Sequence, residues 1–318
     1  MPDIAVLIPS YNHAPFIERA LLSIFGQTLQ PKKLIVIDDG SKDESTVVIE
    51  RVLKDCPFEY EFIKRENRGV CSTLNEGFVK SNGDYFAYLG SDDVWLPNFL
   101  DEQVALLEAR PYAVLAFAHA YVIDEDDNIT DRTDNWTDFA DGNLLPVLLR
   151  GEIFSSPGVV YRRSVLEKHR WNEDAALEDY EMYLLLTIEG EFARNENLLC
   201  AWRQHGWNTS SDYMRMFQEQ LNSQNRMAGQ LNLSPSELHK IQREMKFKAV
   251  TEYLRNGCRR QSIPLLWKNL SGATSATEMV KTLARLSVPQ TLFLWTRRRK
   301  RKAGIKKYGK LRIHEALD

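Results

Sequence analysis

The stretch that decides the fold is GDYFAYLGSDDVW, residues 83–95. Its apolar run, Tyr85 to Leu89, predicts a buried strand that leads to two adjacent carboxylates, Asp92 and Asp93. In an open α/β sheet, ligands bind at the carboxyl ends of the strands. Two neighbouring carboxylates repel each other unless a cation or a hydrogen-bonded hydroxyl compensates them. We therefore expect a hard divalent ion here, a kind of ion that commonly also holds substrate phosphates.

The segments before this strand alternate between aliphatic runs and helical patterns. Strands are predicted at 4–8, 34–37 and 60–63, with a helix after each of them. Continuous aliphatic runs are typical of strands that are buried on both faces of a sheet. Alternating strands and helices imply βαβ units with right-handed crossovers. The sequence therefore predicts an α/β fold with a mainly parallel sheet flanked by helices.

Polar residues follow the first two strands as well as the central one. They are Ser10 to Asn12 after the first strand and Asp38-Asp39-Gly40-Ser41 after the second. Because parallel strands end at the same edge of a sheet, we expect these residues to converge with Asp92 and Asp93. The chain has no GxGxxG after its first strand and no GxxxxGK[ST] anywhere. This argues against a dinucleotide-binding oxidoreductase and a P-loop NTPase, so metal is expected to hold most of any bound phosphate.

The pattern of the chain changes at about residue 212. Before it, a strand at 113–122, an acidic loop or lid at 124–141 and strands at 159–161 and 198–202 continue the α/β pattern. Beyond it the strand patterns vanish and helices are predicted, one of which begins at the capping box of residues 234–237. We therefore expect two domains, residues 1–212 and 213–318, the second being helical.

The composition is that of a soluble globular protein, with 43% hydrophobic and 27% charged residues among 318. The four cysteines are scattered without a CxxC pair, which favours reduced thiols in a cytosolic protein. No signal peptide follows Met1, and no apolar run approaches the ~18 residues of a membrane span. A cytoplasmic location is expected.

The end of the chain is strongly basic. Between Arg297 and Arg312 there are ten Lys or Arg residues and no acid. This run could be a solvated tail, bind nucleic acid, or hold the protein on anionic lipid, where each basic residue contributes about 1 kcal/mol. The preceding apolar residues, Leu292 to Trp295, favour an interfacial helix with a basic continuation. No aromatic residue interleaves with the basic run until Tyr308, which disfavours nucleic acid. We therefore expect peripheral attachment to the inner face of the cytoplasmic membrane.

Taken together, these motifs resemble those of the family 2 inverting nucleotide-sugar glycosyltransferases, which have the GT-A fold. The resemblance covers about residues 4 to 210. It rests on Pro9-Ser10-Tyr11-Asn12, Asp38-Asp39-Gly40-Ser41, Asn67-Arg68-Gly69 with Asn75 and Gly77, Gly83-Asp84-Tyr85, Ser91-Asp92-Asp93, Glu178-Asp179, and His205 with Asn208 and Ser210. The usual Asp-x-Asp-Asp of the family lacks its first acid here, where the chain has Gly90. This difference leaves a third protein ligand for the metal unassigned.

The resemblance implies a site for a nucleotide sugar. Asp39 is expected to accept a hydrogen bond from N3–H of uracil, which favours a uridine diphosphate sugar, although guanine and thymine also carry ring N–H groups. The other residues implied at the donor are Pro9 and Tyr11 beside the base, Arg68 at the base or a phosphate, Asp92 at the ribose hydroxyls, and Asp38, which could instead cap a turn.

The resemblance also implies metal-assisted displacement at the anomeric carbon with inversion. Asp93 is expected to coordinate Mn²⁺ or Mg²⁺ on the diphosphate, and His205 to ligate that metal or touch the diphosphate. Asp179 is the expected general base, supported by Glu178. Two alternatives stay open: acids in a first helical turn also stabilise the helix dipole, and His205 could be a loop histidine satisfied by the backbone.

The expected function is that of a metal-dependent hexosyltransferase that builds a bacterial surface glycan of the O-antigen or capsule type on a polyprenyl-diphosphate-linked acceptor. One alternative is a metal-dependent nucleotidyltransferase, which normally has a glycine- and lysine-rich segment after the first strand that this chain lacks. The other is an inactive sugar-nucleotide-binding protein on the same fold. Retention of four acids argues against this last class: Asp39, Asp92, Asp93 and Asp179. No nucleic-acid partner is expected.

Overall fold

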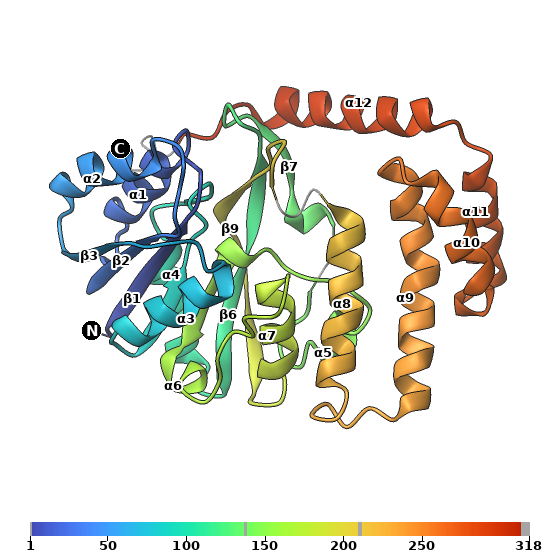
Figure 1. The fold of residues 1–318 in the computed structure, drawn as a ribbon, viewed down its shortest axis with the longest axis horizontal. Helices are drawn as coiled ribbons and strands as arrows, with labels where there is room; N and C mark the ends of the chain where they lie inside the picture. Colours follow the sequence, from blue (N-terminus) through green and yellow to red (C-terminus); the bar gives the residue numbers. More distant parts are fainter. Residues whose placement is uncertain (1, 137–138, 209–211, 313–318) are drawn as a thin grey trace.

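The computed structural model describes residues 2–136, 139–208 and 212–312. Figure 1 shows a central sheet with helices on both faces, followed by a set of helices that extends away from it. Strands and helices alternate along the first part of the chain as predicted: β1 (Ile4–Ser10), α1 (Ile17–Phe25), β2 (Lys33–Asp38), α2 (Ser45–Val52), β3 (Glu59–Lys64), α3 (Val70–Lys80) and β4 (Tyr85–Tyr88).

The second part of the chain completes the sheet. Its elements are β5 (Val94–Trp95), α4 (Phe99–Ala109), β6 (Ala113–Ile123), β7 (Ile129–Arg132), α5 (Leu145–Leu148), β8 (Val159–Arg162), α6 (Arg163–Leu166), α7 (Glu178–Leu186) and β9 (Glu191–Arg203). The strand order is β3-β2-β1-β4-β8-β6-β9-β5, and β7 pairs with β6. Strands β1 to β4, β6 and β9 share one direction, whereas β5, β7 and β8 are antiparallel to their neighbours. The predicted mainly parallel α/β sheet is confirmed.

Strand β1 shows why its sequence is aliphatic throughout. Successive side chains of a strand face opposite sides of the sheet. Val6 and Ile8 pack in the cluster that includes α1, α2 and α4, whereas Leu7 packs in the cluster that includes α3 and α7. All three side chains are fully buried. Each contributes about 1.5–3 kcal/mol of burial free energy, so both faces of the strand must be apolar.

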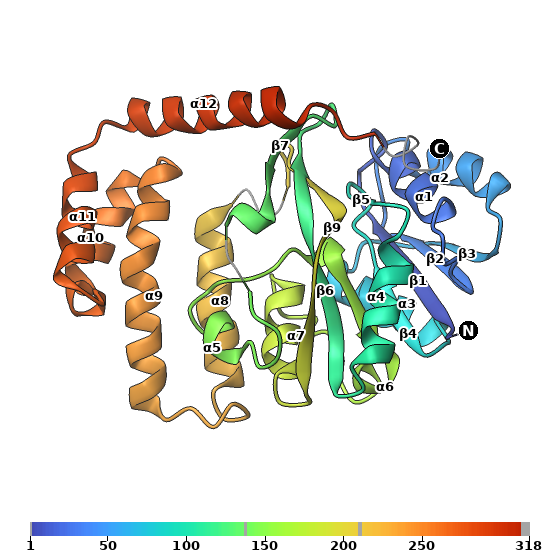
Figure 2. The ribbon, with the colours of Figure 1, turned by 180° about the vertical axis from the view of Figure 1, so that it is seen from behind.

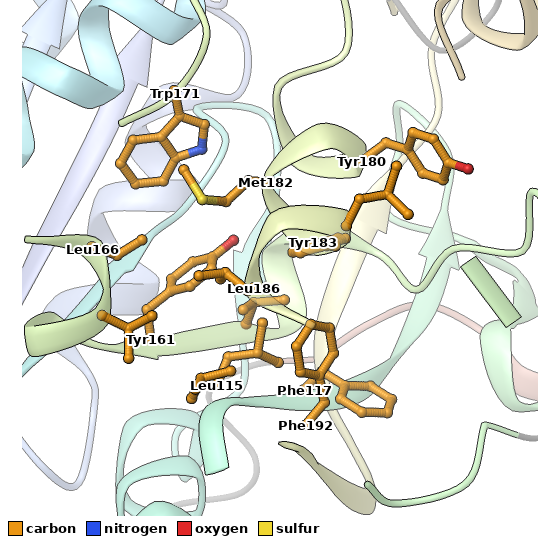
Figure 3. Packing of buried hydrophobic residues seen from close by; sticks show 14 of the residues in the cluster. Leu115, Phe117, Tyr161, Leu166, Trp171, Tyr180, Met182, Tyr183, Leu186 and Phe192 are labelled. Carbon is orange, nitrogen blue, oxygen red and sulfur yellow. The ribbon is translucent and has the colours of Figure 1, made fainter. Parts of the chain in front are cut away.

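An aromatic cluster fixes α7 against the sheet, as Figure 3 shows. The ring of Phe154 lies 4.3 Å from that of Phe117 on β6 and 4.4 Å from that of Tyr183 on α7, measured between centroids. All three rings are buried. This packing matters for function because α7 begins with Glu178 and Asp179, whose position it determines.

Three strands differ from the sequence prediction. The segment expected to be a loop or lid contains β7, in which only Ile129 is buried, so no alternating pattern marks it as a strand. Strand β9 begins at Glu191 and not at Leu198. The sequence did not predict its first half because the polar residues 195–197, where its pairing with β6 shifts register, separate that half from the apolar run. Strand β5 has two residues and is too short for any periodicity to appear.

The chain beyond residue 212 is helical, as expected. It comprises α8 (Tyr213–Met227), α9 (Pro235–Arg255), α10 (Arg259–Lys268), α11 (Ala276–Leu286) and α12 (Gln290–Tyr308). Helix α8 packs on α7, α9 packs on α8, and α10 and α11 lie against α9 (Figure 2). The predicted capping box is present, with Ser234 and Glu237 each bonded to the backbone of the other. The domain boundary between residues 212 and 213 stays a prediction.

Helix α12 returns to the sheet and ends beside β7 (Figure 1). Gly304 lies so close to β7 that a side chain at this position would collide with the backbone of Thr130. Beyond the helix, the N–H of Leu311 donates to the Asp127 carbonyl at 2.9 Å, and the Leu311 carbonyl accepts from Arg19 at 3.0 Å. In the part of the chain described here, no helix is both long and apolar enough to cross a bilayer.

Candidate functional site

The loops that follow β1, β2 and β4 meet at the carboxyl edge of the sheet. The N–H of Asn12, after β1, donates to the hydroxyl of Ser41, after β2, at 2.9 Å. Nδ1 of His13 lies 2.8 Å from the hydroxyl of Ser91, after β4. The predicted convergence of three polar segments is therefore confirmed.

Asp38 caps the turn after β2. Its Oδ1 accepts the N–H of Ser41 at 2.9 Å, and its Oδ2 accepts the Ser41 hydroxyl at 2.6 Å. The side chain is buried. Of the two roles that the sequence left open, the turn cap accounts for these contacts, and contact with a nucleotide stays a prediction.

Asp39 is held by the segment that follows β3. Its Oδ1 accepts the N–H of Arg68 at 2.9 Å and also pairs with the Arg65 guanidinium. Its Oδ2 accepts the N–H of Gly69 at 2.8 Å. Gly69 has φ +87°, a conformation that favours glycine, so the Asn67-Arg68-Gly69 motif forms the turn that presents these two N–H groups. The carboxylate is thus rigid, and only Oδ2 retains a lone pair for a further donor.

The residues predicted beside the nucleotide base lie at this same edge. Pro9 lies near the end of β1 and is half-buried. Tyr11 is the first residue after β1, and its side chain is exposed. Arg68 is exposed, although its backbone is fixed by Asp39. These three side chains are accessible to a ligand, and their contact with the base stays a prediction.

Within the described residues, potential metal ligands gather in one group of three: His13, Asp92 and His205. Their ligand atoms all lie within 4.8 Å of one another. Asp92 Oδ2 is 3.0 Å from His205 Nε2, and Asp92 Oδ1 is 3.7 Å from His13 Nδ1. Asn208 donates to Asp92 Oδ2 at 3.2 Å. Ser210, predicted to act with His205 and Asn208, lies outside the described residues.

The electrostatics of this group suit a cation. Burial raises the pKa of Asp92, but its hydrogen bond to His205 and the charges of His13 and His205 outweigh burial, so this pKa lies below its usual value. Burial lowers the pKa of His13 despite the attraction of Asp92. The His205 side chain is fully buried, and its Nδ1 has no hydrogen-bond partner in the described part of the chain. The unpaired Nδ1 is not the atom that faces Asp92, so the fit to a divalent ion rests on the donor set itself, a carboxylate between two imidazoles.

Asp93 does not belong to this group. Its Oδ1 accepts the backbone N–H of Arg203 at 2.8 Å, and its side chain is buried. Burial and the charge of Asp92 raise the pKa of Asp93 well above its usual value. Asp93 and His205 were the metal ligands that the resemblance implied, whereas in the structure it is Asp92 that contacts His205. The reason is that the N–H of Arg203 engages Asp93, so that only the first of the two acids meets the histidine.

Arg203, at the end of β9, is a structural residue of the site that the sequence analysis missed. Its Nε donates to the Asp92 carbonyl at 2.7 Å, one Nη donates to the Asp124 carbonyl at 2.8 Å, and the other pairs with Asp127 at 2.6 Å. Only 2% of its side chain is exposed. The available signal was an arginine directly after an apolar run, two residues before His205.

Glu178 and Asp179 form the first turn of α7. Asp179 is 8% exposed, and its Oδ1 has no hydrogen-bond partner among the described residues. Burial and the charge of Glu178 raise the pKa of Asp179 well above its usual value, and burial also raises the pKa of Glu178. A helix dipole alone would lower both pKa values. The net rise suits a general base, whose pKa should approach the working pH.

Comparison with known proteins identifies the family of the chain. The model of the family described as "Glycosyl transferase family 2" matches residues 5–170, just over half of the chain. An uncharacterised glycosyltransferase of Nostoc sp. is 32% identical over 169 residues, 52% of this chain and 52% of that protein. The chondroitin synthase of Escherichia coli is 28% identical over 220 residues, 66% of this chain and 30% of that protein. The chain thus spans about half or less of the length of these relatives.

Two solved structures resemble the chain over nearly its whole length. One is a mannosyltransferase from Pyrobaculum calidifontis in complex with GDP-mannose and Mn²⁺, with TM-score 0.60 and 19% identity, covering 96% of this chain and 88% of that one. The other is S. aureus TarS 1–349 in complex with UDP-GlcNAc, with TM-score 0.59 and 15% identity, covering 95% and 92%. At such identities the likeness concerns the fold, and the predicted GT-A fold is confirmed.

Proposed function

The chain belongs to glycosyl transferase family 2, and from this premise we propose that it moves a sugar from a uridine diphosphate sugar to a hydroxyl group with inversion at the anomeric carbon. The observation that carries the proposal is the placement of two different acids at one edge of the sheet. Asp39 is a rigid acceptor with one lone pair left, and Asp92 lies in a group of potential metal ligands.

The free lone pair of Asp39 favours uracil over guanine. Uracil offers one ring N–H, and a single acceptor on Oδ2 satisfies it. Guanine offers N1–H beside an amino group, and a two-point contact would need both carboxylate oxygens. Because Oδ1 already accepts from Arg65 and Arg68, that two-point contact is blocked. Tyr11 would lie along the base, and Arg68 would reach the base or a phosphate.

Asp92 and His205 are the residues that would hold the divalent ion, Mn²⁺ or Mg²⁺. Asp92 thereby takes the role that the sequence analysis predicted for Asp93. When bound, such an ion offsets the negative charge that develops on the leaving diphosphate. Asp93 instead holds the backbone of Arg203, whose side chain binds the carbonyl of Asp92 and so orients the metal-binding loop.

Asp179 is the proposed general base. The attacking hydroxyl approaches the anomeric carbon from the face opposite the diphosphate and loses its proton to the Asp179 carboxylate. The proton affinity of this carboxylate is raised by burial and by Glu178, which makes it a stronger base than an exposed aspartate. Glu178 supports the base through this repulsion.

The acceptor is proposed to be a hydroxyl of a growing, lipid-linked bacterial surface glycan. A face of α12 supports attachment to an anionic membrane surface. We call this face the outer stripe. Its residues recur every three or four positions along the helix and are Leu292, Trp295, Arg299, Lys302 and Lys306. Leu292 is 47% exposed and Trp295 53% exposed, and the Arg299 guanidinium lies 5.3 Å from the centre of the Trp295 ring.

The opposite face of α12 is directed toward the protein. Lys300 pairs with Asp131 at 2.7 Å, and Arg301 pairs with Asp124 at 2.9 Å. Gly304, on the same side, is buried against β7. The outer stripe is therefore available to a surface while the inner face holds the helix in place. An inner-membrane location follows from this proposal.

Calorimetric titration tests the donor assignment. UDP, GDP and dTDP are titrated separately into the full chain with Mn²⁺ and with EDTA. We expect UDP to bind more tightly than GDP and dTDP, and only in the presence of the metal. The Asp39→Asn variant should bind UDP about 10–100-fold more weakly, which corresponds to the loss of one hydrogen bond to a charged group. Glu66→Gln, an exposed neighbour, is the control.

Other outcomes of the titration would redirect the proposal. Binding of GDP or dTDP in place of UDP would overturn the donor assignment. No nucleotide binding would favour an inactive scaffold. Attachment of a nucleotide, and not a sugar, to an acceptor would favour a nucleotidyltransferase.

Vesicle sedimentation tests the membrane proposal. The protein should sediment with vesicles that contain anionic lipid and not with neutral vesicles. Changing Arg299, Lys302 and Lys306 to Glu should abolish sedimentation, because each basic residue contributes about 1 kcal/mol. The control makes the same charge change at three exposed lysines elsewhere, Lys54, Lys240 and Lys248. Equal losses in both variants would show that only net charge matters and would contradict a docking role for α12.

A further inference from the structure

We propose that His13 is the third protein ligand of the metal site, so that two histidines and one carboxylate select a first-row transition-metal ion over Mg²⁺. This inference rests on the proposed function, since it concerns the ion of the same site. It explains how the site works without the acid that the family usually has at position 90.

A side chain at position 90 would press on the carboxylates of the two acids that follow it. A Cβ on Gly90 would lie 3.0 Å from Asp92 Oδ1 and 2.9 Å from Asp93 Oδ2, closer than nearly all real Cβ contacts. A carboxylate at this position would therefore displace the acids that it is meant to assist. The approach to Asp92 Oδ1 is taken instead by His13, whose Nδ1 lies 3.7 Å away.

The backbone holds His13 in this place. Its N–H donates to the hydroxyl of Ser45 at 3.0 Å. The preceding residue, Asn12, has φ +54°, and its side-chain oxygen accepts the N–H of Lys42 at 2.7 Å. The segment after β1 is thus fixed to the segment after β2 at the histidine itself and at the residue before it. Such a fixed backbone is what a preorganised ligand requires.

The donor distances match a bound ion. Ligand atoms about 2.1 Å from a metal lie about 3.0 Å apart at neighbouring octahedral positions and about 3.4 Å apart in a tetrahedron. Asp92 Oδ2 is 3.0 Å from His205 Nε2, and the other oxygen, Oδ1, is 3.7 Å from His13 Nδ1. The three ligand atoms lie within 4.8 Å of one another, so rotations of the side chains would bring them onto one ion. Three protein ligands leave positions open for the oxygens of a diphosphate.

The donor set determines the choice of ion. Mg²⁺ binds oxygen ligands almost exclusively, and it gives up its water reluctantly. Imidazole nitrogen binds first-row transition metals more readily, and two histidines with one carboxylate form a set known for open coordination positions. A site with only Asp92 and His205 would discriminate less between a transition-metal ion and Mg²⁺. The ratio of the affinities for Mn²⁺ and Mg²⁺ therefore measures the contribution of His13.

A competing explanation is that His13 only anchors its loop through Ser91, whose hydroxyl lies 2.8 Å from Nδ1. Three variants separate the two explanations. Ser91→Ala removes the anchor and keeps the ligand. His13→Ala removes both. His13→Asp replaces nitrogen by oxygen, which makes the set harder and should raise the affinity for Mg²⁺ relative to Mn²⁺.

The experiment uses the full chain with UDP. Mn²⁺ and Mg²⁺ affinities are measured by calorimetry, and pulsed electron paramagnetic resonance of bound Mn²⁺ counts the coordinated nitrogens. We expect two nitrogen couplings in the unmodified protein and in Ser91→Ala, and one in His13→Ala. We expect His13→Ala to lose at least about tenfold in Mn²⁺ affinity, with a smaller loss for Mg²⁺.

Each contrary result has a distinct meaning. If UDP binding requires metal but His13→Ala keeps two couplings and the same Mn²⁺ affinity, the inference is wrong and the proposed function stands. If UDP binds equally well with EDTA, the inference fails together with the metal role in the proposed function, while the assignment of a UDP-sugar donor stands. If His13→Ala does not fold, His13→Asp decides: an unchanged ratio of Mn²⁺ to Mg²⁺ affinity would overturn the inference.

Discussion

Replacing Asp179 by Asn removes a charge from a buried position and leaves the volume of the side chain almost unchanged. Asp179 is 8% exposed, and its Oδ1 has no hydrogen-bond partner in the described part of the chain. If this carboxylate takes the proton of the acceptor, the Asn variant should lose about 10²–10⁴-fold in turnover. Its affinity for UDP should be unchanged, because the proposed contacts of the nucleotide lie elsewhere.

The same substitution should stabilise the protein at neutral and alkaline pH. Burial and Glu178 raise the pKa of Asp179 in the folded state. Between the unfolded pKa, about 3.9, and this higher value, the folded protein keeps a proton that the unfolded chain has released. Stability is therefore greatest below the unfolded pKa and falls as pH rises through the folded pKa. The Asn variant, which carries no charge to bury, should therefore be more stable than the unmodified protein at pH 8.

Two assays on the same samples measure these effects. Turnover is followed by the release of UDP, and the free energy of unfolding is measured at pH 5 and pH 8. Asp174→Asn, an exposed acid just before α7, is the control and should change neither quantity. An Asp179→Asn variant that turns over within about threefold of the unmodified protein would refute the role of base. A variant less stable than the unmodified protein at pH 8 would refute the argument from burial.

Three further predictions concern the framework of the site. Arg203→Ala should lower the free energy of unfolding by about 3–5 kcal/mol in urea titration, since it removes the buried donor to two backbone carbonyls and leaves Asp127 with Arg19 alone; a loss below 1 kcal/mol would contradict this. Gly304→Ala should cost about 1–3 kcal/mol, because the new methyl group meets the backbone of Thr130, and it should speed proteolysis within α12; unchanged cleavage would show that the contact is not required. Phe154→Ala should lower thermal stability by about 3–5 kcal/mol through the cavity it leaves among the aromatic rings, and a shift under 1 kcal/mol would mean that the cluster refills.

The sequence predicted the strands that are buried on both faces and missed those that depend on distant pairing. Strands β1, β2 and β4 contain unbroken aliphatic or aromatic runs because helices cover both sides of them. Strand β7 has no such pattern, since it lies off the main strand order and, among the described strands, pairs with β6 alone. Strand β5 exists because two residues after the acids pair with the far end of β9. Local periodicity carries no information about such pairings.

The candidate site was predictable in its residue types and not in its detailed contacts. The positions of Asp39 and Asp179 followed from motifs and their place after a strand or at the start of a helix. Which of Asp92 and Asp93 meets His205 depends on Arg203, which is 110 residues away from Asp93 in the chain. No spacing rule connects residues so far apart.

The contact between Leu311 and the loop after β6 has a consequence for how the protein is made. The Asp127 side chain that pairs with the buried Arg203 belongs to the residue whose carbonyl receives Leu311. A ribosome adds about 5–20 residues per second. The chain from His205 to Leu311 therefore emerges over about 5–20 s, during which the sheet and its acids can already have folded. For those seconds the nascent chain would hold the candidate site without this support, which forms only once Leu311 has emerged.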